Sequence, residues 1–127
     1  MKTLSRILLA LSALVFVFGA WIHTSAFGRM SDSVAKSDLP AFLGKGFRVL
    51  WLQDSAIQIV LAILFAFLAI RPAAATRPIV LLIALMPATT TVLIYCFIGS
   101  FIGGHIFLAA SAAAIVGGLL KSEKRQD

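Results

Sequence analysis

The chain has 127 residues, of which 61% are hydrophobic and only 13% are charged. Its charges leave three long gaps: residues 7–28 and 78–120 contain no Asp, Glu, Lys or Arg, and residues 49–70 contain only Asp54. The gaps hold about two thirds of the chain, more than the interior of a soluble domain of this size can bury, so the composition excludes a soluble protein. The length leaves no room for a second domain, and we expect one domain over residues 1–127.

At about 20 apolar residues per spanning helix, the three gaps hold one, one and two spans. The sequence therefore predicts an all-α integral membrane protein, a four-transmembrane-helix antiparallel bundle. We expect spans at about 4–26, 49–70, 78–98 and 102–120, and an outer loop at 27–47. Within that loop, Leu39-Pro40 is typical of the start of a short interfacial helix, and Gly44 and Gly46 would let the chain bend before the second span.

The N-terminal segment has a second interpretation. Lys2 and Arg6, followed by an apolar stretch and the small residues of Thr24-Ser25-Ala26, are also typical of a cleaved secretory signal peptide. The apolar stretch continues to Ile22, however, which is longer than a usual signal-peptide core. We therefore expect an uncleaved first span, and a mature protein that begins at Phe27 would contradict this expectation.

Basic residues are distributed unevenly between the two ends of the predicted spans. With the N-terminus inside, the cytoplasmic side holds seven Lys and Arg residues and the outer side four, which favours an N-in/C-in topology. The net charge of +6 also predicts contact with anionic lipids at the cytoplasmic face of the lipid bilayer. We expect no nucleic acid partner, because no basic cluster is interleaved with aromatic residues. The seven are Lys2, Arg6, Arg71, Arg77, Lys121, Lys124 and Arg125.

Two features of the last two spans concern helix packing. Ala110, Ala114 and Gly118 are spaced by four residues, which predicts the close approach of another helix. Pro87 lies in the middle of the third span and cannot donate a backbone hydrogen bond. We expect a helix bend near residues 83–87, with the hydroxyls of the threonines at 89–91 bonding the freed backbone groups.

Three ionisable residues share one depth near the outer ends of the spans. Counted from the outer flanks at 1.5 Å per residue, His23, Asp54 and His105 each lie roughly 8 to 9 Å inside, and Gln58 and Tyr95 belong to nearby levels. An ionisable side chain inside a membrane is unfavourable enough to mark a candidate functional site. We expect Asp54 to pair with His23 or His105 in a polar pocket that opens toward the outer face.

Each of these residues also has a purely structural interpretation. Asp54 could extend to water or to Arg48 at the interface. His23 lies close enough to the outer surface to be an interfacial histidine. His105 lies among small residues, which favours burial as a hydrogen-bonded structural histidine. Equal depth does not establish that the three side chains meet, so these alternatives remain open at this point.

The chemistry that the three residues would support depends on their meeting. Two histidines and a carboxylate are ligands that zinc and non-haem iron accept. Without a metal, Asp54 would be a titrating carboxylate for proton-coupled transport. The sequence contains no serine elbow, paired carboxylates, glycine-rich phosphate loop or local histidine pair with metal-binding spacing, so we expect neither an enzyme nor a bound cofactor other than a metal.

Four spans in 127 residues, with a long first outer loop, resemble the plan of the small four-helix bacterial membrane proteins of the DoxX-like kind. Small multidrug exporters share this size, but they carry a central glutamate in the first span, where this chain has none. We expect an accessory or structural subunit of a larger complex or homo-oligomer in the bacterial inner membrane. The alternatives are a pocket protein that binds a metal, quinone or small solute, and a small proton-coupled transporter.

Overall fold

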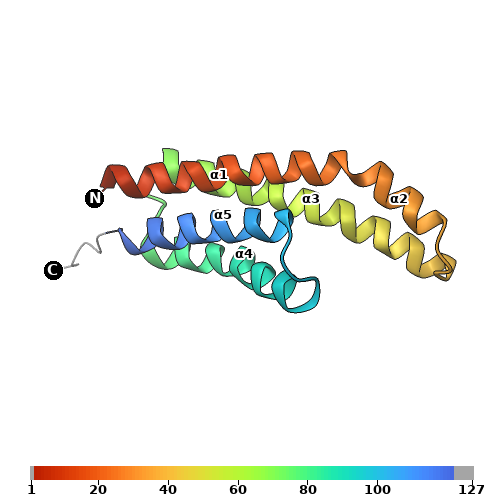
Figure 1. The fold of residues 1–127 in the computed structure, drawn as a ribbon. Helices are drawn as coiled ribbons and strands as arrows, with labels where there is room; N and C mark the ends of the chain where they lie inside the picture. Colours follow the sequence, from red (N-terminus) through yellow and green to blue (C-terminus); the bar gives the residue numbers. More distant parts are fainter. Residues whose placement is uncertain (1, 122–127) are drawn as a thin grey trace.

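The computed structural model describes residues 2–121, and helices account for most of them (Figure 1). Four helices are long and apolar enough to cross a membrane, which confirms the expected all-α class and the number of membrane-length helices. A short helix, α2 (Phe27–Ala35), follows the first of them. The four long helices are α1 (Lys2–Ser25), α3 (Ala41–Ile70), α4 (Arg77–Phe97) and α5 (Ile102–Leu119). Of the basic residues assigned to the cytoplasmic side, Lys124 and Arg125 lie outside the described residues.

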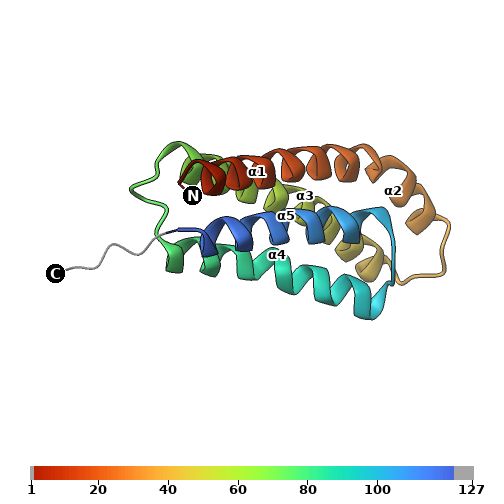
Figure 2. The ribbon, with the colours of Figure 1, turned by 60° about the vertical axis from the view of Figure 1, so that its left-hand side comes forward.

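The long helices pack in the spatial order α3, α1, α5, α4, and each neighbour runs antiparallel to the next (Figure 2). Between α1 and α5, the Ser5 hydroxyl donates to the carbonyl of Gly117 at 2.6 Å, and the Ser12 hydroxyl donates to the carbonyl of Ala110 at 2.8 Å. From the first bond to the second, the residue number rises on α1 and falls on α5, as it must for antiparallel helices. Both hydroxyls are buried, and each donates to a backbone carbonyl of the neighbouring helix. Hydrocarbon tails could not accept such a hydrogen bond, so these contacts favour the packed helices.

Small residues set how closely α5 approaches its two neighbours. Ala110 and Ala114 are fully buried, and Gly117 lies so close to α1 that a Cβ there would be 3.3 Å from the carbonyl oxygen of Ser5. Gly118 faces α4, where a Cβ would be 2.9 Å from a methyl of Val80. Ala110, Ala114 and Gly118, the small residues spaced by four, therefore lie where α5 packs against its neighbours α1 and α4. Dispersion between the closely packed backbones stabilises the fold there.

Gly118→Ala is expected to lower the free energy of unfolding by about 1 kcal/mol, because the added methyl must displace the side chain of Val80. Thermal unfolding followed by circular dichroism in detergent would measure the change. Gly46→Ala is the matched control, since a Cβ at Gly46 meets nothing within 4 Å. Equal behaviour of the two variants would contradict the close approach of α5 to α4.

The segment expected as an outer loop, residues 27–47, is helical except near residues 36–40. A helix does begin directly after Leu39-Pro40, as expected, but it is continuous with the second long helix instead of being short. After a bend at Ala26, α2 continues in the general direction of α1 and packs beside the start of α3 (Figure 1). Helix α3 begins after Pro40 and runs through Gly44 and Gly46 without a break. Gly44 is a contact point, not a bend, since a Cβ there would be 3.2 Å from a methyl of Val34 on α2. We call this helical hairpin, residues 27–48, the helical tip.

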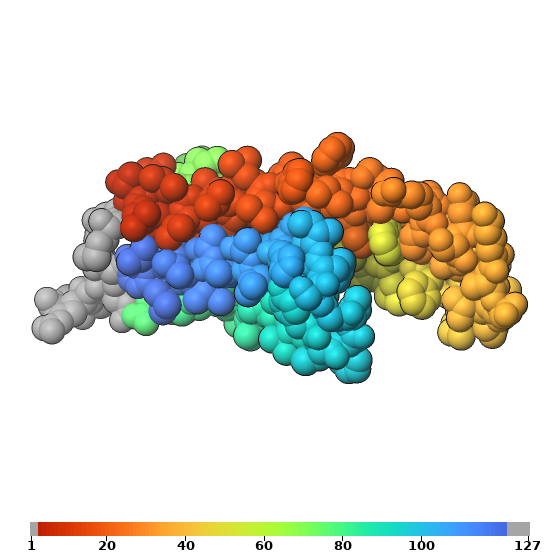
Figure 3. Space-filling model, in the orientation of Figure 1, coloured from red at the N-terminus to blue at the C-terminus, as the bar shows by residue number. Residues whose placement is uncertain are grey.

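The helical tip projects beyond the α4–α5 connection (Figures 1 and 3). At the opposite end, which we call the terminal end because α1 begins there and α5 ends there, Arg6 bonds the carbonyl of Ala69 and Lys121 bonds the carbonyl of Pro72. The ends of α3 and α5 are therefore level. Since α3 has 30 residues and α5 has 18, at 1.5 Å per residue α3 extends about 18 Å further.

Helix α4 passes through Pro87 as one continuous helix. Pro87 cannot donate to the carbonyl of Ile83, and we expected nearby threonine hydroxyls to bond the freed group. That expectation is wrong: each hydroxyl instead donates to the carbonyl four residues before its own, as threonine commonly does within a helix. The bonds run from Thr89 to Leu85, from Thr90 to Met86 and from Thr91 to Pro87, at 2.9, 3.1 and 2.8 Å.

Candidate functional site

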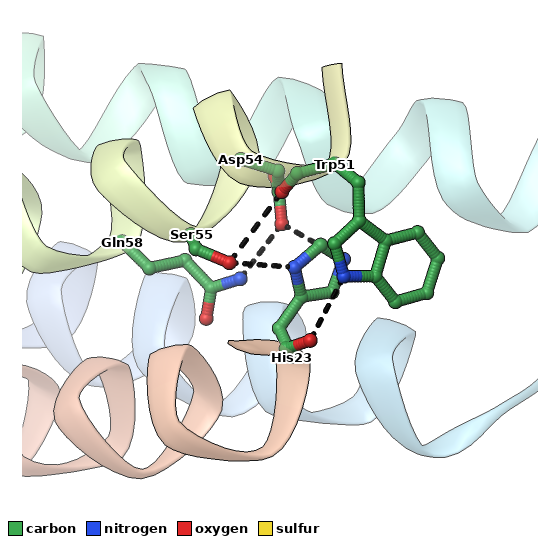
Figure 4. Close-up of polar contacts among 5 residues, drawn as sticks. All are labelled: His23, Trp51, Asp54, Ser55 and Gln58. Atoms are coloured by element: carbon green, nitrogen blue, oxygen red, sulfur yellow. Dashed lines mark hydrogen bonds and ion pairs between the residues drawn. The ribbon is translucent and has the colours of Figure 1, made fainter. Parts of the chain in front are cut away.

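The structure brings His23 and Asp54 together across the α1–α3 contact (Figure 4). His23 lies in the last turns of α1, Asp54 lies in the middle of α3, and His23 Nε2 is 3.5 Å from Asp54 Oδ2. Their side chains retain 25% and 32% of their full exposure, so both are partly buried and still reachable from the surface. Asp54 is therefore paired with a histidine, which is one of the two arrangements that its position in the sequence allows; the other was a side chain extended to water or to Arg48.

Two further side chains of α3 fix the imidazole of His23. The Trp51 indole stacks on the ring, with centroids 4.1 Å apart and planes 14° apart, and its Nε1–H donates to the carbonyl of His23 at 2.8 Å. At the edge of the ring, Ser55 Oγ lies 2.9 Å from His23 Nδ1. The ring is therefore held by a face contact and by a hydrogen bond at one nitrogen, with its other nitrogen toward Asp54 (Figure 4).

Gln58, one helical turn after Asp54 on α3, completes the hydrogen-bond network around the His23–Asp54 pair. Its Nε2 donates to Asp54 Oδ2 at 2.7 Å, and the side chain is almost fully buried. Its Oε1 has no hydrogen-bond partner among the described residues and occupies the place where a Cβ of Gly19 would be. Flipping the amide would place two oxygens against each other at Asp54, so the orientation is fixed. Gly19 is therefore the residue on α1 that makes room for Gln58.

The hydrogen bonds define which protons the network can hold. An ionised Asp54 favours a proton on His23 Nε2, which leaves Nδ1 of the neutral ring to accept from the Ser55 hydroxyl. If Nδ1 also takes a proton, the Ser55 hydroxyl rotates to accept it and can donate to the carbonyl of Trp51, 3.4 Å away. The arrangement can therefore bind and release one proton at Nδ1 with only a hydroxyl rotation.

Sequence reasoning did not place Trp51 and Ser55 among the site residues. With Asp54 and Gln58 they are spaced at i, i+3, i+4 and i+7, which puts all four on one face of α3. On α1, Gly19 and His23 are likewise four apart. This spacing was visible in the sequence, but only the contact between the two helices identifies the face as a joint site.

Arg48, the alternative partner for Asp54, points into the helical tip instead. Its Nε donates to Ser31 Oγ at 2.8 Å and its terminal nitrogen donates to the carbonyl of Ser31 at 3.2 Å. Because Arg48 lies six residues before Asp54 on the same helix, the two do not share a face that would bring them together. Arg48 therefore stabilises the packing of α2 on α3.

His105 does not join this site, and its expected burial is wrong. It is exposed and bonds Tyr95, whose hydroxyl lies 2.7 Å from His105 Nδ1, while Ser100 Oγ lies 3.4 Å from Nε2. The face of α5 turned toward its neighbours carries Gly104, Ile106 and Phe107, which leaves His105 directed along the α4–α5 connection.

The metal set of His23, Asp54 and His105 is consequently wrong. No group of three or more His, Cys, Asp or Glu side chains that could hold a metal occurs within residues 2–121. Two side chains alone do not make a zinc or non-haem iron site. The candidate site thus reduces to a carboxylate–imidazole pair on α1 and α3, with a separate tyrosine–histidine pair on α4 and α5.

The pair on α1 and α3 is suited to reversible proton binding or to hydrogen bonding a small polar solute. The resemblance to DoxX-like proteins is one of size and number of spans and adds no residue to either pair. No family model, curated protein or solved structure matches this chain, so its function has to be inferred from its own residues.

Proposed function

We propose that this chain is a small multi-pass protein of the bacterial inner membrane, with both termini in the cytoplasm, that acts as an accessory or structural subunit of a membrane complex. Basic side chains at the terminal end support this orientation, because cytoplasmic ends of spans are enriched in Lys and Arg. The helical tip also has basic residues, but Asp32 and Asp38 partly offset them. Within the described helix ends and connections, the basic residues of the terminal end are Lys2, Arg6, Arg71, Arg77 and Lys121.

The single observation that carries the subunit proposal is the apolar surface of the helical tip. Helices α4 and α5, at 21 and 18 residues, match a hydrocarbon core of about 30 Å, so the further 18 Å or so of α3 extends beyond it. There Phe42 is 83% exposed and Phe47 is 54% exposed, with Leu39 and Leu43 beside them in the chain. Lipid tails do not cover side chains at that height.

The composition of the tip favours a protein as the partner. Lys36, Asp38 and Lys45 lie close in sequence to the apolar residues, so the tip combines exposed aromatic side chains with charges of both signs. An apolar centre with aromatic anchors and a polar rim is the usual composition of a protein–protein interface. We therefore expect the tip to contact the extracytoplasmic part of another subunit.

A photo-activatable crosslinking residue in place of Phe42 is expected to give one adduct of defined mass in intact cells. The reason is that a buried interface holds one partner against the probe, whereas a lipid-facing probe meets no fixed protein. The same residue in place of Leu82 is the matched control, since Leu82 is 72% exposed on the spanning helix α4. Immunoblotting of the membrane fraction would show the adducts.

Replacing Phe42 and Phe47 together by serine should reduce recovery of the same adduct partner, without changing the amount of protein in the membrane. Equal adducts at positions 42 and 82, or none at position 42 in correctly inserted protein, would contradict the subunit proposal. An adduct of twice the chain's own mass would identify a homo-oligomer as the complex.

A second function, a proton-coupled or solute-binding role, is favoured by the pair of His23 and Asp54. An ionisable pair inside a span is unfavourable unless it is partnered, and such pairs mark proton and substrate sites in many membrane proteins. With the three-residue metal set excluded, a quinone, another small solute or a proton is the remaining ligand of this alternative. The Trp51 ring, stacked on His23, offers a direct optical test. That the chain is not an enzyme stays a prediction.

A further inference from the structure

A groove runs along the α1–α3 contact, on a different side of α1 from the serines that bond α5. It has a volume of about 380 Å³. Alanines form most of its floor, because two helices that meet through small residues leave a hollow where longer side chains would otherwise project. The alanines are Ala10, Ala13, Ala62, Ala66 and Ala69, with Leu14 and Val17 among the larger side chains at its edge.

The groove continues toward the terminal end into a second hollow of about 310 Å³, which is lined by Thr3 and Arg6 as well as by Ala10 and Ala69. Arg6 Nε donates to the carbonyl of Ala69 at 2.9 Å, which holds the guanidinium at the mouth of the groove. The bonded carbonyl belongs to the last turn of α3, whose partial negative charge neutralises the cation only in part.

A second cation lies near Arg6. Burial, followed by the charge of Arg6, lowers the pKa of Lys121 below its ordinary value. The ammonium of Lys121 donates to the carbonyl of Pro72 at 3.3 Å, and no carboxylate within the described part of the chain pairs with either cation. As far as residues 2–121 are concerned, the mouth of the groove therefore carries two cations without a paired carboxylate, beside an apolar channel.

We propose that this groove binds one anionic phospholipid of the leaflet at the terminal end, with an acyl chain along the alanines and the headgroup phosphate on Arg6. A guanidinium is the side chain best suited to a phosphate, because it donates two parallel hydrogen bonds. Basic pockets between transmembrane helices are known to hold anionic headgroups. This site is more specific than a general attraction of basic residues to the membrane surface, and it does not depend on the tip or on the His23–Asp54 pair.

A second copy of the chain fits the groove less well than a lipid does. Small residues would allow two α1–α3 faces to approach closely. In a parallel two-fold dimer, however, groove would face groove at the same depth, and the two Arg6 side chains would be brought together. Like charges in that position destabilise the pair, whereas a phosphate neutralises them.

Native mass spectrometry of the detergent-purified protein would test the lipid site, with phosphatidylglycerol and phosphatidylcholine of identical acyl chains as probes. We expect the wild-type chain to retain phosphatidylglycerol preferentially. Arg6→Gln should lower that retention about fivefold and leave phosphatidylcholine unchanged, because one basic contact with an anionic headgroup is lost. Arg6→Lys, which keeps the charge, should restore most of the preference. Arg77→Gln is the control for a basic residue at the same end that does not line the groove.

Filling the groove provides a variant that leaves Arg6 in place. Ala66→Leu should lower the retention of both lipids, whereas Ala112→Leu on an exposed face of α5 should not. Circular dichroism and thermal unfolding would check that each variant is folded. Equal retention of the two lipids by the wild-type chain, an unchanged preference in folded Arg6→Gln, or a lipid-free species of twice the chain's mass would overturn the proposal.

Discussion

Gly19→Val is expected to lower the free energy of unfolding by about 3 kcal/mol and to separate α1 from α3 at the candidate site. A Cβ at Gly19 would collide with the amide oxygen of Gln58 and lie 2.9 Å from a methyl of Ile106 on α5. Both neighbours are buried, so neither can turn aside into lipid. Overpacking of this kind costs about 1 to 3 kcal/mol, and the displaced Gln58 would also lose its hydrogen bond to Asp54.

Unfolding in detergent, followed by circular dichroism against temperature or denaturant, would measure this loss. Gly46→Val is the matched control, because it makes the same exchange in a helix where the added side chain meets open space. The double variant Gly19→Ala with Gln58→Ala should lose less stability than the sum of the two single variants, since removing the Gln58 side chain removes the collision. Purely additive losses would show that the two residues do not meet.

The fluorescence of Trp51 is expected to fall severalfold when His23 takes a second proton. An imidazolium accepts an electron from an excited indole more readily than neutral imidazole does, and the two rings are stacked 4.1 Å apart. The measurement is a fluorescence titration from about pH 4 to 9 in the Trp21→Phe background, which leaves Trp51 as the only indole in the chain. His23→Gln should abolish the pH dependence.

Asp54→Asn should move the midpoint of that titration to lower pH, because it removes the carboxylate charge, 3.5 Å from the imidazole, that favours the protonated ring. The control is Trp51→Phe with Trp21 retained. Trp21 is mostly exposed and packs near Phe18 rather than a histidine, so its emission should not follow pH. If Trp51 emission stayed constant across the range, or if Asp54→Asn left the midpoint unchanged, the proton-coupled interpretation would be lost and the pair would be purely structural.

Much of the fold follows from the placement of charges along the chain. A hydrocarbon core of fixed thickness requires about 20 apolar residues per crossing, and the last two helices fall within one residue of the bounds expected from that length. That Asp54 and His23 share one level could be predicted for the same reason, since each helical residue adds a constant rise, and the contact between the two side chains agrees with it. The spacing of Trp51, Ser55 and Gln58 around Asp54 also put them on one face.

The helix at residues 27–35, and the unbroken helix through Gly44 and Gly46, could not be predicted from local pattern alone. Ser31, Asp32 and Ser33 have weak helix propensity, and Gly44 and Gly46 weaken the start of α3. Contact between the two segments decides the outcome, because Arg48 bonds Ser31 and the missing Cβ of Gly44 lets Val34 approach. Tertiary packing of this kind routinely outweighs propensity.

The sequence by itself determined that this protein has four segments long and apolar enough to cross a membrane, and that Asp54 interrupts the second of them. Only the tertiary structure decided that Asp54 meets His23 and not His105. Depth along a helix follows from residue number, but lateral neighbours follow from the order and rotation of the helices. Here the serines and glycines between α1 and α5, which allow close packing, set that order, and they leave His105 with Tyr95 on the far side of the molecule from α3.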